Sequence, residues 1–129
     1  MKKIFLFAAV LFISTLTYSQ RLLSWTPEFP EENSTLATIV DCTKGNQGLL
    51  NFEGGNSGNV YVHVGLITSL STGPSDWRYV KFTWGTADPA AKATPLGSNK
   101  YQYNITNIRT FFGVPAGETI KKVCIIFRN

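Results

Sequence analysis

The clearest alternating pattern in the chain lies at residues 59–67, which read Asn-Val-Tyr-Val-His-Val-Gly-Leu-Ile. Successive side chains of an extended strand point to opposite faces, so the valines share one face and Tyr61, His63 and Gly65 share the other. A strand with one apolar face packs that face against a core and leaves the other accessible. The segment therefore predicts a half-buried β-strand.

Further short runs rich in β-branched and aromatic residues surround it, separated by Gly, Pro and Asn clusters that are typical of turns. We expect strands at residues 22–25, 36–42, 59–67, 76–84, 100–105 and 119–128. Residues 106–113 are expected to form a short helical turn, and residues 88–99 an Ala/Pro/Gly-rich connection. About six short strands with regularly spaced turns are typical of an all-β, Ig-like β-sandwich.

The last expected strand, at residues 119–128, has apolar residues on both faces. Such a strand is normally central in its sheet and covered on both sides. The sequence ends at Asn129, which would leave this strand at a sheet edge and prone to aggregation. We therefore expect a sandwich that lacks its last strand, in a chain that is a fragment of a longer protein.

The composition predicts one folded domain without a metal centre or a cofactor. The chain has 129 residues, of which 16% are charged and 13% aromatic. Two Cys and one His exclude a cysteine-rich zinc module and a scaffold built from several disulfides.

Residues 1–19 have the layout of a secretory signal peptide, and the predicted module spans residues 20–129. Basic residues at positions 2 and 3 precede an apolar run at 4–16, and small residues occupy the −3 and −1 positions before Gln20. The apolar run is shorter than the roughly 20 residues of a membrane-spanning helix, so no membrane anchor is expected. We expect a secreted protein, extracellular or periplasmic.

The charge left after cleavage gives no support for nucleic-acid binding. Loss of Lys2 and Lys3 lowers the net charge from +4 to +2, and no basic stripe remains.

Export leaves two alternatives open for the cysteines. Cys42 and Cys124 would meet oxidising conditions, in which a disulfide closing so long a loop is worth roughly 4 kcal/mol. The competing interpretation is two buried free thiols, because sequence alone does not place the two Cα atoms within bridging distance.

No residue pattern in the chain predicts catalysis, so we do not expect an enzyme. The only histidine, His63, lies in the middle of a strand with no nucleophile motif near it, which favours a structural role. The carboxylates lie mostly in turns and at strand ends, and no pair of them is singled out.

The positive functional signal is aromatic. The alternation at residues 76–84 separates Val80, Phe82 and Trp84, which we expect to face the core, from the residues between them. If the two strands are neighbours, the outer face carries a row of rings beside hydrogen-bonding groups, which suits the apolar and hydroxylated faces of a sugar. The alternative is a second small core beneath the long loops. The predicted ligand-binding residues are Trp77, Tyr79, Tyr61, His63 and Lys81.

Several segments in order along the chain carry a family resemblance. They are Lys44–Leu49, Asn59–Thr68, Ser75–Lys81, Trp84-Gly85, Asn107–Arg109, Phe112–Glu118 and Phe127-Arg128. Together they resemble the N-terminal Ig-like, carbohydrate-binding-type module of secreted bacterial alpha-amylase-family glycoside hydrolases. Asn59 stands where members of that family usually have Asp, and the family continues after the Phe-Arg pair with an Asp-Gly turn and one more strand.

The resemblance implies a non-catalytic module that binds an alpha-glucan such as starch, followed in the parent chain by a catalytic domain. It assigns no ligand residues to this chain. The alternative function is a structural Ig-like spacer or a protein-interaction module that binds no glycan.

Overall fold

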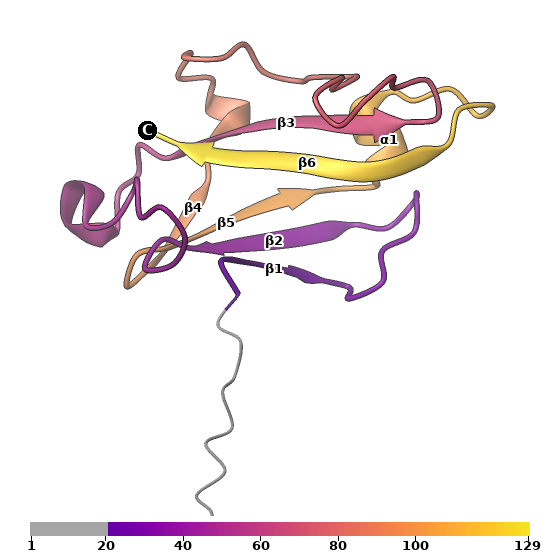
Figure 1. The fold of residues 1–129 in the computed structure, drawn as a ribbon. Coiled ribbons are helices and arrows are strands. Elements are labelled where there is room, and N and C mark those ends of the chain that lie inside the picture. Colours follow the sequence, from indigo (N-terminus) through magenta and orange to yellow (C-terminus); the bar gives the residue numbers. More distant parts are fainter. Residues whose placement is uncertain (1–20) are drawn as a thin grey trace, which may run out of the picture.

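The computed structural model describes residues 21–129 and consists mostly of β-strands in two antiparallel sheets (Figure 1). The predicted signal peptide at 1–19 lies outside the described residues. The strands are β1 (Leu23–Thr26), β2 (Leu36–Asp41), β3 (Tyr61–Thr68), β4 (Thr94–Gly97), β5 (Lys100–Ile105) and β6 (Ile120–Arg128). The helical segments are η1 (Phe52–Gly55), η2 (Pro89–Ala91) and α1 (Ile108–Phe112).

The strands form a four-stranded sheet in the order β1-β2-β5-β4 and a two-stranded sheet of β3 and β6. Figure 1 shows the β3–β6 pair lying above the β1-β2-β5 layer, so the predicted all-β sandwich architecture is confirmed. The predicted helical turn near 106–113 is also present as α1, whose first turn is capped by the Asn107 side chain.

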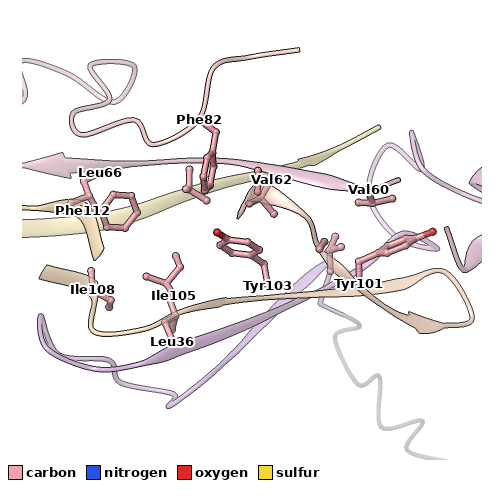
Figure 2. Packing of buried hydrophobic residues seen from close by; sticks show 14 of the residues in the cluster. Leu36, Val60, Val62, Leu66, Phe82, Tyr101, Tyr103, Ile105, Ile108 and Phe112 are labelled. Atoms are coloured by element: carbon pink, nitrogen blue, oxygen red, sulfur yellow. The ribbon is translucent and has the colours of Figure 1, made fainter. Parts of the chain in front are cut away.

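The core lies between the two sheets and is built on the inner face of β3. Val60, Val62, Val64 and Leu66 are fully buried, as the alternation at residues 59–67 predicts. Burying one such side chain is worth about 1.5–3 kcal/mol. Facing them from the other layer are apolar and aromatic side chains of β5 and β2 (Figure 2), which include Leu36, Tyr101, Tyr103 and Ile105.

The buried tyrosines keep their hydroxyl groups hydrogen-bonded. The Tyr103 hydroxyl donates to the Ala90 carbonyl at 2.8 Å, and the Tyr101 hydroxyl accepts from the Ser57 N–H at 3.3 Å. Burial raises the pKa of Tyr103 to about 12. These bonds fix the connection at 88–93 and the loop before β3 against the core, so both segments have defined positions.

One strand was not expected from the sequence. Residues 94–97 form β4, which pairs with β5 through a tight turn at Ser98 and Asn99. Both turn residues have positive φ angles, 51° and 62°, which is the geometry of a two-residue β-hairpin. The Pro and Gly content of residues 88–99 hides this hairpin, because Pro95 occupies an edge strand.

The strand predicted at residues 76–84 is wrong. The backbone of this segment pairs with β3 only through a bridge between Leu66 and Arg78 and a bond from the Lys81 N–H to the Val64 carbonyl at 3.1 Å. Tyr79 has a φ of 55°, which breaks the extended alternation. Consequently Phe82 is buried as predicted, whereas Val80 and Trp84, also assigned to the core, are exposed.

The strand expected at residues 119–128 is present as β6, and it lies at a sheet edge, as expected for this chain. Among residues 21–129, β6 pairs only with β3 and therefore forms a sheet edge. Its side chains at 123–125 are partly buried and Ile126 is exposed.

The cysteines follow the free-thiol alternative rather than the disulfide. Cys42 lies in the core after β2, and its N–H donates to the Asn99 carbonyl at 2.9 Å. Cys124 faces Gly65 across the β3–β6 pair, and Gly65 alternates with the core valines, so the Cys124 side chain lies on the outer face. The two thiols therefore belong to different layers, and burial raises the pKa of each.

A glycine allows the 76–84 segment to lie against β3. A Cβ atom added at Gly65 would sit 3.1 Å from Val80 Cγ2, 3.3 Å from the Arg78 carbonyl oxygen and 3.3 Å from Trp77 Cε3. Three neighbours at such distances are closer than ordinary van der Waals contact, so a methyl group fits only if they move by a few tenths of an ångström.

We predict that Gly65→Ala lowers the free energy of unfolding by about 1–3 kcal/mol, because the segment must shift outward. Gly73→Ala is the matched control, since a Cβ at Gly73 meets nothing within 4 Å. Urea unfolding followed by tryptophan fluorescence measures both. Equal stability of the two variants would contradict the close packing at Gly65.

Candidate functional site

The outer face of the β3–β6 pair carries a group of aromatic side chains, here called the outer aromatic cluster. The alternation that buries the valines turns Tyr61 and His63 to this face, and the neighbouring loop brings further rings over it. The outer aromatic cluster consists of Tyr61, His63, Trp77, Trp84 and Arg128.

His63 lies at the centre of the cluster. Its ring stacks on Trp77 with centroids 5.9 Å apart and planes inclined by 23°. Trp84 approaches the same ring edge-on, at 5.1 Å and 86°. Both distances lie in the favourable range for aromatic pairs, so His63 fixes the orientation of the two indoles. His63 and Trp77 are partly buried, whereas Trp84 is 58% exposed.

Arg128 lies between the rings of Tyr61 and Trp84. It lies directly opposite Tyr61 across the strand pair, and its guanidinium carbon is 5.5 Å from the Tyr61 ring centre and 5.8 Å from that of Trp84. These are cation–π distances. The guanidinium also donates to the Thr86 carbonyl, which ties the loop that carries Trp84 to the end of β6.

The cluster contains two polar atoms without protein partners. Within the described part of the chain, His63 Nδ1 and Arg128 Nε are the buried side-chain nitrogen or oxygen atoms that make no hydrogen bond. Buried polar atoms are normally paired, so this pair marks the cluster as unusual within the fold.

Three of the predicted ligand-binding residues, Tyr61, His63 and Trp77, are brought together, and two are not. The Tyr79 hydroxyl donates to the Glu118 carboxylate, and Lys81 lies over the Phe111 ring at 5.4 Å. The cause is again the positive φ of Tyr79, which redirects the side chains that follow Trp77.

Trp84 and Arg128 are the cluster members that the sequence analysis missed, and the reason is clearest for Trp84. Strict alternation from Val80 through Phe82 placed it in the core, but the segment is not a strand, so the period of two does not apply. The neighbouring Gly85, with a φ of 78°, is the signal of a turn at this point.

Glu118 is the centre of a separate polar cluster, which involves Tyr79 of the 76–84 segment and Thr68 at the end of β3. Its carboxylate accepts hydrogen bonds from the Thr68 and Tyr79 hydroxyls, and the residue is only 8% exposed. These hydrogen bonds, the one from Thr68 first, hold the pKa of Glu118 below its ordinary value, and the bond to Glu118 raises the pKa of Tyr79. All these groups have partners, so the cluster joins the loop after β3 to the start of β6.

Glu32 extends this polar network to α1. It pairs with Arg109, whose guanidinium also donates to the carbonyls of Pro115 at 2.6 Å and Glu118 at 3.0 Å. Residues 21–129 contain no group of three or more His, Cys, Asp or Glu side chains placed to hold a metal ion.

An apolar groove, here called the β6 groove, runs along the open side of the sandwich between β1 and β6. It consists of cavities of about 710 and 390 Å³ that share Leu23 and Ile125 as walls. The larger cavity is also lined by Trp25 and Val123, and the smaller by Phe127. The larger cavity contains no residue of the outer aromatic cluster, whereas the smaller one is also lined by Trp84 and Arg128 and therefore borders the cluster.

Comparisons with protein-family models, with curated proteins and with solved structures give no match. The resemblance described above therefore stays a prediction. The described residues form no helix with the length and hydropathy needed to cross a membrane.

We predict that Glu118→Gln lowers stability at neutral pH and weakens its acid dependence. The folded-state pKa of Glu118 is below the ordinary value of 4.5, so its charge contributes stability that is present above pH 4.5 and lost as pH falls through the lower folded value. Hydrogen bonding also lowers the pKa of Glu32, Asp41, Glu53 and Asp76, which keeps part of the acid dependence in the variant.

Urea unfolding between pH 7 and pH 3 tests this, with the exposed Glu31→Gln as the control. An acid dependence in Glu118→Gln equal to that of the control would show that the carboxylate is not held by these hydrogen bonds.

Proposed function

We propose that this chain is a non-catalytic carbohydrate-binding module that binds an alpha-glucan of the starch type through the outer aromatic cluster. The observation that carries the proposal is Trp84, which is 58% exposed while its ring is held by His63 on one side and Arg128 on another. An exposed indole with a fixed orientation binds the apolar face of a sugar ring at little cost in side-chain entropy.

The polar members of the cluster add a second kind of contact. The Arg128 guanidinium lies beside the rings of Tyr61 and Trp84, where it is placed to donate to sugar hydroxyls at the edge of the platform. The Tyr61 ring is partly exposed and borders the same cation. Aromatic rings flanked by donors match a ligand that has apolar faces and hydroxylated edges.

The platform is small, so the expected affinity is modest. Covering the exposed part of one indole contributes at most a few kcal/mol, and the entropy lost on association offsets part of this, so we expect a Kd of about 1 mM or weaker. A repeating polymer compensates for weak single contacts by offering many equivalent units. The proposed role is therefore an accessory module that keeps a secreted polysaccharide-degrading enzyme near its substrate. The choice of alpha-glucan, the secretion and the following catalytic domain are supported by the resemblance and the predicted signal peptide.

A second candidate function is an interaction or spacer module that binds no glycan. The observation that favours it is the β6 groove, an apolar surface whose larger cavity contains no residue of the aromatic cluster. In this case the exposed Trp84 ring would contribute to neither glycan binding nor retention in a polysaccharide gel.

Affinity electrophoresis in gels containing soluble starch separates the two candidates. We predict retarded migration of the chain and loss of at least nine-tenths of that retardation in Trp84→Ala, because the exposed stacking surface is removed. Trp77→Ala is expected to reduce the retardation partly, since Trp77 orients the His63 ring.

Trp25→Ala is the matched control, because Trp25 is a 42% exposed tryptophan on β1, outside the cluster. Circular dichroism checks that the variants fold. Migration of the wild type that is unaffected by starch would reject glucan binding, and equal loss in Trp25→Ala would place the binding surface elsewhere.

A further inference from the structure

One edge of β6 has unpaired backbone groups whose positions follow from the pairing of β3. On the edge that faces away from β6, carbonyls of even-numbered residues in and just before β3 accept hydrogen bonds from other segments. The acceptors are Val60, Val64 and Leu66, and the donors are the N–H groups of Ala93, Lys81 and Arg78 respectively. The alternating residues of β3 therefore turn their N–H and C=O groups toward β6. In the observed register these face Lys122, Cys124, Ile126 and Arg128.

The remaining residues of β6 consequently point their backbone groups to the open side. These residues are Val123, Ile125 and Phe127, and no backbone hydrogen bond beyond the β3 pairing reaches them from residues 21–129. A row of free N–H and C=O groups on an extended edge is a template for one more strand.

The side chains of the same three residues line the β6 groove. They face Val62, Val64 and Leu66 in the register of the pair, so they point toward the core. They are only partly buried because nothing among the described residues covers them from the open side. An added strand would therefore gain backbone hydrogen bonds and apolar burial at alternate positions together.

The charge along this edge is positive. Lys121, Lys122 and Arg128 are the charged residues of β6, and Lys44 lines the groove near Arg128. Glu28 and Glu31 line the opposite end, near Lys121 and Lys122. Positive charge is therefore least compensated at the Arg128 end.

A second copy of this chain fits the edge poorly. Two β6 strands in an antiparallel register that uses all three free residues would pair Val123 with Phe127, and so would place Lys122 beside Arg128. Like charges directly opposite each other destabilise a strand pair.

We propose that the open edge of β6 binds an extended acidic segment of another polypeptide, as an antiparallel strand with apolar side chains in the β6 groove and carboxylates beside Lys122 and Arg128. The proposal is distinct from glycan binding because the strand pairing uses the edge and inner face of β6, although the two surfaces share Arg128. The outer side chains of such a strand lie beside Arg128, Ile126, Cys124 and Lys122 in turn. The heptapeptide Glu-Val-Thr-Val-Thr-Val-Glu has the matching pattern, with both ends blocked.

Amide hydrogen exchange of the full chain, measured by NMR, tests the edge directly. Without peptide, the amides of Val123, Ile125 and Phe127 are expected to exchange fast and those of Cys124 and Ile126 slowly. At a peptide concentration ten times the Kd, exchange at the first three is expected to slow by about tenfold. The control is a peptide with the valines moved to the outward-facing positions, Glu-Thr-Val-Thr-Val-Thr-Glu. It is expected to slow exchange at none of these three amides.

A charge exchange tests the acidic specificity. We expect Lys122→Glu to weaken binding of the heptapeptide about fivefold, and a peptide ending in Lys instead of Glu to restore it. Lys92→Glu, an exposed lysine outside the groove, is the control and is expected to bind as the wild type does.

Three results would overturn the proposal. One is protection of Val123, Ile125 and Phe127 in the free monomer, which would show that a segment of the same chain already covers the edge. Another is concentration-dependent dimerisation with protection of the same amides, which would assign the edge to a second copy. The third is that the heptapeptide and its outward-valine control bind equally well, or that neither of them binds.

Discussion

The alternation of side chains along β3 is the constraint on which the rest of the structure depends. Because Val60, Val62, Val64 and Leu66 are fully buried against β5 and β2, the residues between them must face outward. A shift of one residue would expose the valines and bury His63. The same strand therefore determines the core of the sandwich and the surface on which the outer aromatic cluster is assembled.

The two-stranded sheet explains why this small fold has two distinct candidate surfaces. β3 has the 76–84 segment against one edge, through Leu66–Arg78 and Val64–Lys81, and β6 against the other. The absence of a side chain at Gly65 lets Trp77 and Val80 lie directly on the sheet, which brings Trp77 within stacking distance of His63. On the other side β6 is an edge, and its inner side chains border a groove. One short sheet thus has an aromatic outer face and an apolar, unpaired edge.

Sequence patterns predicted the strands that have one clear inward face, and missed the features that depend on how segments pair and pack with one another. The strands at 36–41, 61–68 and 100–105 were found because each has a clear inward face. The 76–84 segment has the same alternation but is not a strand, since one left-handed residue, Tyr79, redirects it. That single angle removed Tyr79 and Lys81 from the predicted site and brought Trp84 into it. The separate layers of Cys42 and Cys124 depend on strand pairing, which no single-strand pattern contains.

The central claim is that the outer face of β3 and its neighbouring loop form the glycan contact. NMR titration of the chain with a linear malto-oligosaccharide tests it at the residues themselves, because each of the three tryptophans has one indole N–H group. The account predicts progressive shifts for Trp84 and Trp77 together with the His63 ring, while the Trp25 signal stays in place. Shifts confined to Trp25 and the larger cavity of the β6 groove, or no shift in any indole at millimolar sugar, would contradict it.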